Sequence, residues 1–123
     1  MNARGLSPTG IERLKKRVDF LAAAKAKSVA MAGVVVQARD RKDEGPVRVG
    51  FTVTRKLGSA VVRNRIKRRL REAARLSLPG EARPGYDYVL VGRAAGLKRP
   101  FLSLQNDIAS ALKRLHPQPI SRG

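Results

Sequence analysis

The chain has 123 residues, with 27 Lys and Arg against 9 Asp and Glu, so its formal net charge is +18 at pH 7. A charge this one-sided repels itself in the folded state, and it predicts a large anionic partner. Apolar residues make up 42% of the chain, which excludes a purely disordered basic tail and predicts one folded domain. Cysteine is absent, which excludes disulfides, thiolate nucleophiles and cysteine-based zinc sites.

Both ends of the chain have the composition of flexible segments, because residues 1–8 and 117–123 carry Gly, Ser and Pro without periodicity. We expect a single domain over residues 9–116. His116, the single histidine, precedes the prolines of HPQP and is expected to be a solvated tail residue. No stretch approaches the roughly 20 apolar residues of a membrane span, and the N-terminus lacks the apolar run of a secretory signal. The sequence therefore predicts a soluble, cytoplasmic protein.

A first helix is predicted near the N-terminus. Thr9 and Glu12 have the spacing of a capping box, and the helical pattern continues through RLKKRVDFLAAAK, with a second start signal at Asp19. The helix is amphipathic, with cations around most of its surface. Three apolar side chains are predicted to share its buried face: Leu14, Val18 and Leu21.

Four later segments have the patterns of strands or of a packed helix. Residues 29–38 are apolar and β-branched, with Gly33 as the bend between two strand segments. After a polar turn, VRVGFTVT alternates as a half-buried strand does, and YDYVLVG at residues 86–92 predicts another strand. The final helix is predicted at residues 101–115, with five apolar side chains on one face: Leu104, Ile108, Ala111, Leu112 and Leu115.

Between the last two strands lies a strongly basic helix, VVRNRIKRRLREAAR, at residues 61–75, with Ser59 as its predicted N-cap. At about 100° per residue, four apolar side chains form a stripe roughly 80° wide that can pack on a sheet. The stripe consists of Val62, Ile66, Leu70 and Ala73. The other faces carry almost only cations, and the single acid, Glu72, has Arg68 as its expected ion-pair partner. Unpaired cations at this density predict a platform for nucleic-acid phosphates.

The order of these elements predicts an α/β sandwich. A helix that connects two strands implies a parallel pair, and helices then cover one or both faces of a small sheet. General packing rules alone favour a right-handed crossover. The sequence shows no nucleophile, base or metal-ligand cluster that would support catalysis by the protein itself.

The segment TRKLGSAVVRNRIKRRLREAAR, residues 54–75, closely resembles the signature of the bacterial ribonuclease P protein component, whose RNR core is here Arg63, Asn64 and Arg65. The segments RLKKRVDF, RVGFTVT and GYDYVLVGR and the closing helix also correspond, so the likeness covers roughly residues 13–115. The resemblance implies an α+β fold: one small RNA-binding domain with about four strands and three helices. It also implies a left-handed β-α-β crossover through the RNR helix, as in domains of ribosomal proteins.

The resemblance also implies a function. Members of this family are accessory proteins of a ribozyme that cleaves precursor tRNA to give the mature 5′ end, and the RNA subunit with its Mg²⁺ ions carries the hydrolysis. We therefore expect no catalytic residue and no metal ligand in this chain, and neither a membrane nor an obligatory protein partner. Carried over position by position, eight residues would face the catalytic RNA: Arg55, Lys56, Arg63, Asn64, Arg65, Lys67, Arg68 and Arg71.

A second RNA contact is implied near the first helix. Phe20 would line a cleft between that helix and the sheet, where the family holds the single-stranded 5′ leader of the precursor and where bases can stack on an aromatic ring. Core packing is the alternative for Phe20. Ala24 and Gln37 stand where the family often has further aromatics, so weaker stacking is expected, with more of the affinity left to cations. These cations are Lys15, Lys16, Arg17 and Arg48.

Three other functions remain to be weighed. A ribosomal or other structured-RNA-binding protein could use the same basic helix without taking part in turnover. A DNA-binding protein fits less well, because cations surround the helix instead of forming one short reading edge. A protein nuclease fits least. The combination of residues 13–20 with the signature at residues 54–75 favours the ribonucleoprotein enzyme, since a generic RNA binder has no reason to combine them.

Overall fold

The computed structural model describes residues 11–117, which form one α+β domain. Over these residues a five-stranded sheet has the order β1-β4-β5-β3-β2. The strands are β1 (Glu12–Arg13), β2 (Lys27–Ala30), β3 (Val34–Asp40), β4 (Arg48–Thr52) and β5 (Tyr86–Gly92). The helices are α1 (Arg17–Ala24), α2 (Ala60–Ser77) and α3 (Phe101–Leu115), with 3-10 turns η1 (Arg55–Leu57) and η2 (Ala94–Leu97). The expected flexible ends lie outside the described residues, except for residue 117.

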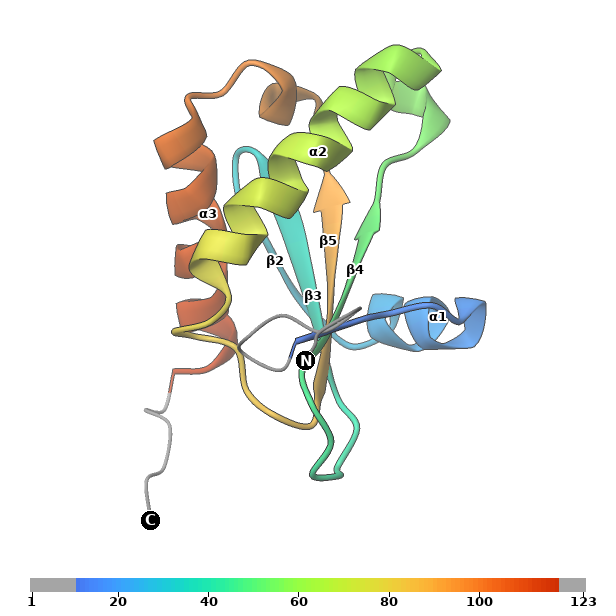
Figure 1. The fold of residues 1–123 in the computed structure, drawn as a ribbon, viewed down its shortest axis with the longest axis vertical. Coiled ribbons are helices and arrows are strands. Elements are labelled where there is room, and N and C mark those ends of the chain that lie inside the picture. The colour runs from blue at the N-terminus through green and yellow to red at the C-terminus, as the bar shows by residue number, and fades with distance from the viewer. Residues whose placement is uncertain (1–10, 118–123) are drawn as a thin grey trace, which may run out of the picture.

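The sheet is mixed, and its central parallel pair confirms the predicted crossover. β4 and β5 are parallel, β3 is antiparallel to β5, and β2 and β3 form a hairpin around the predicted bend at Gly33. In Figure 1, β4 and β5 both point upward, α2 descends in front of the sheet, and β5 lies to the left of β4. A crossover that moves leftward in front of its sheet is left-handed, against the general preference. The fifth strand, β1, was missed because two residues carry no alternation.

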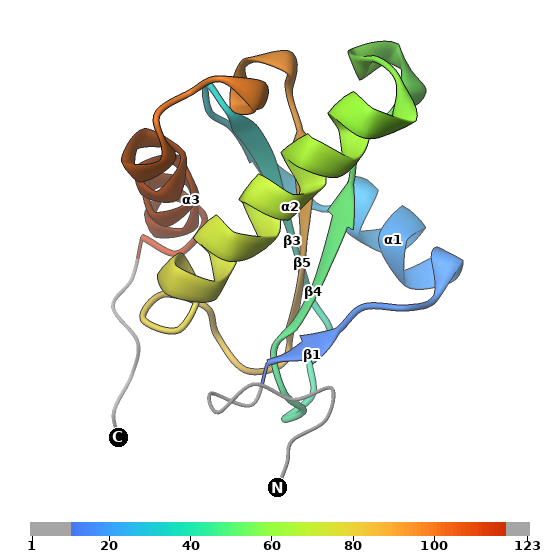
Figure 2. The same cartoon turned by 45° about the horizontal axis from the view of Figure 1, so that its top comes forward.

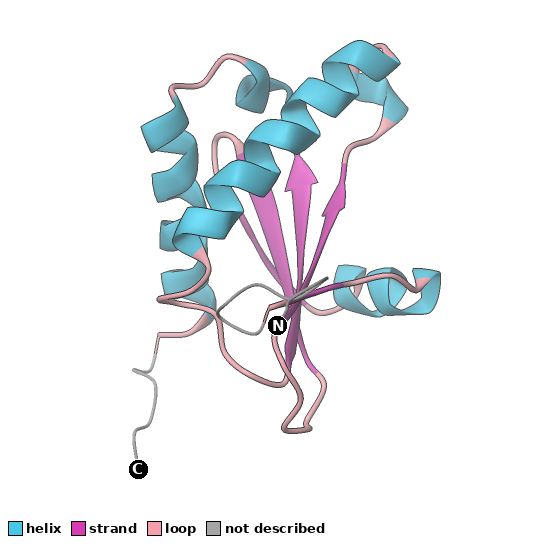
Figure 3. Cartoon of the chain, in the orientation of Figure 1, coloured by secondary structure: helices cyan, strands magenta, loops and turns pink. Residues whose placement is uncertain are grey.

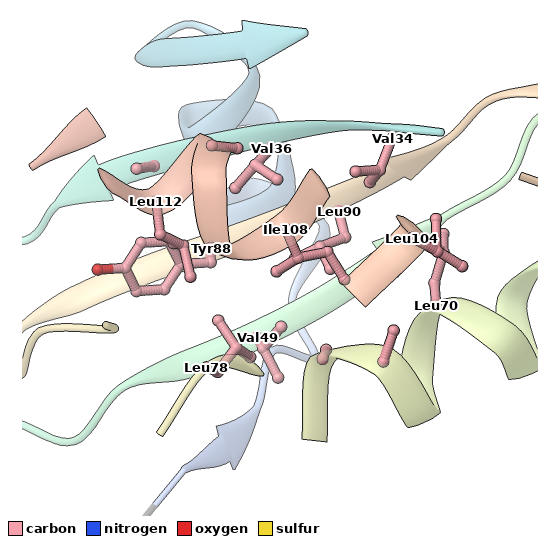
Figure 4. Close-up of a cluster of buried hydrophobic side chains, with 14 of the residues drawn as sticks. Val34, Val36, Val49, Leu70, Leu78, Tyr88, Leu90, Leu104, Ile108 and Leu112 are labelled. Carbon is pink, nitrogen blue, oxygen red and sulfur yellow. The ribbon is translucent and has the colours of Figure 1, made fainter. Parts of the chain in front are cut away.

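The two faces of the sheet are covered unequally. α2 and α3 pack side by side on one face, and α1 lies on the other (Figures 1, 2 and 3). Figure 4 shows the main core, where side chains of β3, β4 and β5 meet those of α2 and α3. The apolar faces predicted for both helices are confirmed, since Ile66, Leu70 and Ala73 are buried and all five residues predicted on α3 are buried. Val62 packs at the core's edge.

The predictions for the first helix were wrong in its start and in its buried face. Glu12 lies in β1, where its N–H donates to the Val47 carbonyl at 2.8 Å, so it forms no capping box; Thr9 lies outside the described residues. The helix begins at Arg17 and leaves Val18 66% and Leu21 49% exposed. An eight-residue helix is marginal in isolation, so strand pairing and tertiary contacts determine its limits and its orientation.

His116 is not a solvated tail residue. Its Nε2 lies 2.6 Å from the Tyr88 hydroxyl, and its ring packs edge-on against Tyr86 at 4.7 Å between centroids. Burial, together with the nearby positive charges of Arg83 and Lys27, lowers the pKa of His116 to about 4. The Tyr88 oxygen accepts a hydrogen bond from the Arg83 backbone N–H, so its own proton is available to the neutral imidazole. The neighbouring prolines had suggested that His116 is exposed. Its partner Tyr88 lies on the central strand, far from it in sequence, so the sequence did not reveal the contact.

No helix among residues 11–117 is long and apolar enough to cross a membrane.

Candidate nucleic-acid interface

The basic helix α2 is held so that its cations face outward. Ser59 caps it as predicted, with its side-chain oxygen accepting from the Val62 N–H at 3.3 Å. Gly58, with φ of 139°, makes the reversal between η1 and α2 in a backbone region that favours glycine. Because the apolar stripe is buried against the sheet, the polar faces of α2 are directed to solvent. The surface made by η1 and these faces of α2 is called the basic surface below.

Several cations of the basic surface already have intramolecular partners. Arg63 Nε donates to the Gly58 carbonyl at 3.2 Å, and the Arg71 guanidinium lies 5.8 Å from the centroid of the Phe51 ring. The predicted partner of the single acid was wrong, because Glu72 pairs with Arg75 at 2.5 Å and not with Arg68. An acid placed before a base along a helix is the better orientation, since it agrees with the helix dipole.

The remaining polar residues of the basic surface are free. Apart from Arg69, whose contacts are described below, their side chains make no hydrogen bond, ion pair or ring contact among residues 11–117. Asn64, for which a local hydrogen bond was one interpretation, is exposed and makes none there. The free cations are Arg55, Lys56, Arg65, Lys67 and Arg68. The part of the surface with unpaired charge is therefore η1 and the first half of α2.

Arg69 lies on the same helix but has a structural role. Its two terminal nitrogens donate to the carbonyls of Gly96 and Arg99. Arg99 in turn pairs with Asp107 at 2.6 Å, and Asp107 accepts the buried N–H of Gly33 at 3.0 Å. This chain of contacts joins α2, η2, α3 and the β2–β3 turn. The sequence could not reveal it, because the partners of Arg69 are backbone carbonyls distant along the chain.

Phe20 packs on the face of the sheet opposite α2, called the α1 side below. It belongs to a small cluster with Leu14, Ala23 and Val89, and it is partly exposed. A Cβ atom added at Gly50 would lie 2.5 Å from Phe20 Cε1, so the ring rests directly on the backbone of β4. Phe20 is thus a packed residue that still presents part of its ring to solvent.

The strand residues around Phe20 are small or polar. Gln37 pairs with Val89, and Val35 and Thr52 both pair with Val91, so these residues share the α1 side. Gln37 is partly exposed, and its amide makes no hydrogen bond within the described part of the chain. The structure therefore brings Phe20 and Gln37 to the same side of the sheet.

The predicted leader cation Arg48 is paired within the protein. Arg48 donates two hydrogen bonds, of 2.7 and 2.9 Å, to the carboxylate of the fully buried Asp87, and these bonds raise the pKa of Arg48. Arg41 also bonds Asp87 at 2.8 Å, and Arg39 bridges Asp87 and Asp19 at 3.5 and 3.2 Å. Sequence reasoning missed this ion network, because its members lie on four separate elements of the chain.

The other predicted leader cations are exposed. Lys15, Lys16 and Arg17 lie just before and at the start of α1, and their side chains have no partner among the described residues.

The carboxylates of the described residues do not form a site for Mg²⁺. No group of three His, Asp or Glu side chains there has the arrangement of a metal site. The oxygens of Asp19, Asp87 and Asp107 are instead bonded to arginines. A dedicated magnesium site needs unpaired oxygen ligands.

Comparison with known proteins identifies the family of the chain. The family model described as Ribonuclease P matches residues 10–116. The chain belongs to the bacterial ribonuclease P protein family. It is therefore the protein component of the endoribonuclease RNase P, an RNA-binding protein of tRNA processing. This membership favours the ribonucleoprotein enzyme over the ribosomal and DNA-binding alternatives.

Individual relatives support the assignment along most of the chain. The RNase P protein component of Ruegeria pomeroyi is 53% identical over 116 residues, covering 90% of this chain and 92% of the relative. That of Caulobacter vibrioides is 55% identical over 102 residues, covering 82% of this chain and 68% of the relative. The solved Staphylococcus aureus RNase P protein superposes with a TM-score of 0.69 at 32% identity, covering 85% and 94%. The Thermotoga maritima RNase P protein superposes with a TM-score of 0.69 at 32% identity, covering 84% of this chain and 96% of the solved one.

Proposed function

We propose that this RNase P protein binds the catalytic RNA through the basic surface. The observation that carries the proposal is the division of α2 into a buried apolar stripe and cations that lack acidic partners in the described chain. Each unpaired cation that neutralises a phosphate releases counterions, which favours assembly. The proposed contacts are Arg55, Lys56, Arg63, Asn64, Arg65, Lys67, Arg68 and Arg71.

Two of these contacts are pre-oriented. The hydrogen bond of Arg63 to Gly58 and the stacking of Arg71 on Phe51 restrict long side chains before RNA arrives. Restricting a side chain in advance lowers the entropy that binding removes. The guanidinium groups suit two-point contacts to phosphate, while Lys56 and Lys67 act as point charges.

The 5′ leader of precursor tRNA is proposed to lie on the α1 side, beside Phe20. The part of the ring that remains exposed can stack on one unpaired base, and Gln37 offers an amide without a partner. Lys16 and Arg17 supply positive charge near the start of α1. Arg48 lies on the same face, but its guanidinium is already bonded to Asp87. Its contribution to leader binding is therefore mainly to hold the α1 side in shape through that bond.

Hydrolysis is assigned to the RNA subunit. Mg²⁺ held by that RNA would supply the activation of water and the neutralisation of phosphate charge, and the buried carboxylates of the described chain, Asp87 and Asp107, are already paired with arginines. The protein binds the RNA subunit at one surface and the leader at the other. It thereby orients the precursor without contributing a reacting group.

Reconstitution tests the proposal. The protein, a bacterial RNase P RNA and a precursor tRNA are combined at low magnesium concentration, and cleavage is followed with each component omitted in turn. We expect no cleavage by the protein alone and faster cleavage when it is added to the RNA. Efficient cleavage by the protein alone would exclude RNA-borne catalysis, and a lack of stimulation would exclude the proposed subunit role.

A further inference from the structure

Helix α1 carries two apolar pairs on opposite sides. At about 100° per residue, the midpoint of Phe20 and Ala23 lies roughly 180° from that of Val18 and Leu21. The structure packs the first pair on the sheet and exposes the second. The two pairs offer comparable apolar area, so burial alone favours neither strongly. Another contact must determine which side of α1 faces the sheet.

Asp19 supplies that contact. Its Oδ1 lies 3.2 Å from Arg39 Nη1, its Oδ2 lies 3.5 Å from Arg48 Nη2, and its side chain is 15% exposed. Both arginines also pair with Asp87, which is fully buried. Turning Val18 toward the sheet would carry Asp19 away from both guanidinium groups. Asp87 would then be the one remaining ion-pair partner of Arg39 and Arg48 within the described chain, while Arg41 keeps Asp43 as well.

Apart from the packing of Phe20 and Ala23 on the sheet, no side chain of α1 other than Asp19 makes a hydrogen bond, ion pair or ring contact within the described chain. The helix has eight residues, its N-cap Lys16 makes no side-chain capping bond, and such a short helix is marginal by itself. The chain before it is held by the Leu14 N–H, which donates to the Val49 carbonyl at 2.8 Å. That bond fixes where α1 starts but not which of its sides faces inward.

We propose that Asp19 is a positioning residue that selects the side of α1 facing the sheet and thereby places Phe20 beside the leader. The proposal rests on the leader site proposed above. Arg39 and Arg48 hold the Asp19 carboxylate in one position, and this fixes the rotation of α1 about its axis. Loss of the Asp19 charge allows the Val18 and Leu21 side to compete for the sheet.

Thiol labelling measures the orientation directly, because the chain has no cysteine of its own. Val18→Cys and Ala23→Cys are introduced separately into the full chain, assembled with RNase P RNA, and treated with a maleimide. With Asp19 present, the thiol at position 18 should react fast and that at 23 slowly, since the native side chains are 66% and 0% exposed. Leu21→Cys is a second reporter on the exposed side, should Ala23→Cys disturb folding.

In the Asp19→Asn background the two rates should move in opposite directions. Labelling at position 23 should rise by about tenfold, the factor expected for one lost charge-assisted hydrogen bond, while labelling at 18 and 21 should fall only slightly, because the packed state remains the major one. Faster labelling at all positions would mean that α1 only frays, and unchanged rates would mean that Asp19 is dispensable. Either result overturns the proposal. Glu44→Gln, which removes an exposed carboxylate without a partner among the described residues, is the matched control and should change nothing.

A suppression experiment supplies the functional readout. Asp19→Asn should lower the ratio of precursor to mature-tRNA affinity of the holoenzyme by up to about fivefold, the loss expected when Phe20 no longer stacks on the leader. Adding Val18→Ser and Leu21→Ser should restore the ratio, because the competing apolar side is gone. A triple variant as weak as Asp19→Asn would refute selection between the two sides.

The two proposals fail in distinguishable ways. If Phe20→Ala leaves the precursor ratio unchanged, the leader site is wrong, whatever Asp19 does. The labelling rates still decide the role of Asp19 in that case, because they are measured without any leader.

Discussion

Arginines have opposite uses in two regions of this molecule. On α2, Arg65 is exposed and makes no contact within the described chain, whereas on the α1 side Arg48 is bonded to a fully buried carboxylate, Asp87. The side chains are chemically identical, and both regions lie within a chain of net charge +18. The difference shows that the count of cations does not measure the RNA-binding surface. The positions of the few acids in space decide which cations remain available.

The largest effect is expected from a substitution in the ion network around Asp87. Asp87→Asn leaves the arginines around a neutral amide and should reduce the free energy of unfolding by about 3–5 kcal/mol, as removal of one partner of a buried ion pair does. Denaturant unfolding measures it. Asp43→Asn, at a residue whose side chain is 52% exposed and which contacts Arg41, is the control and should have a far smaller effect. Equal losses would show that Asp87 is no more important than a surface acid.

The second effect probes the unpaired region. Arg65→Ala should leave stability unchanged but weaken assembly with the RNA subunit by about 1.5–3 kcal/mol, the range for a charge-assisted hydrogen bond. The slope of log affinity against log salt should also fall by roughly 0.7 to 0.9 for the phosphate lost. Binding titrations at several salt concentrations measure both. Arg69→Ala is the contrasting variant: it should lower stability, because Arg69 holds the carbonyls of Gly96 and Arg99. An unchanged salt slope for Arg65→Ala would contradict direct phosphate contact.

The same contrast explains what the sequence could predict. The stripe of α2 and the apolar face of α3 each repeat over about three turns, so periodicity located both helices and their buried sides. The strands of the central pair were found because their side chains alternate or form continuous apolar runs. The left-handed crossover came only from the family resemblance, because local patterns carry no information on handedness.

Short elements and non-local pairs were beyond prediction. β1 has two residues, and α1 has two apolar pairs on opposite sides, so Val18 and Leu21 suggested the wrong buried face of the helix. Leu14 is buried as predicted, but it precedes the helix. Asp87 lies within a clear strand pattern, yet its arginine partners depend on the register of three strands. The residues of the basic surface were predictable as cations. Whether a given cation bonds within the protein, as Arg69 does, depends on backbone carbonyls that only folding brings near it.

The third effect tests the leader site. Phe20→Ala should weaken binding of leader-bearing precursor relative to mature tRNA by about 1 kcal/mol, the lower end of the range for one stacked base, because the ring is partly packed. Leu14→Ala is the matched control, since it removes a neighbour in the same cluster without an aromatic face. Both variants should lose stability, and only Phe20→Ala should change the ratio of the two affinities. Equal weakening of both ligands by Phe20→Ala would argue against stacking of the leader.

An effect of similar size to that of Phe20→Ala, on stability instead of binding, concerns His116, which joins the end of α3 to Tyr88. At neutral pH, His116→Gln should reduce stability by about 1 kcal/mol for the lost hydrogen bond. The folded-state pKa is about 4, below the ordinary value of 6.5, so the unfolded chain takes up a proton first as the pH falls. The stability that depends on neutral His116 is therefore complete above pH 6.5 and is lost progressively toward pH 4. Thermal unfolding across this range should show a steeper decline for the native chain than for His116→Gln, whereas parallel curves would place the imidazole in solvent.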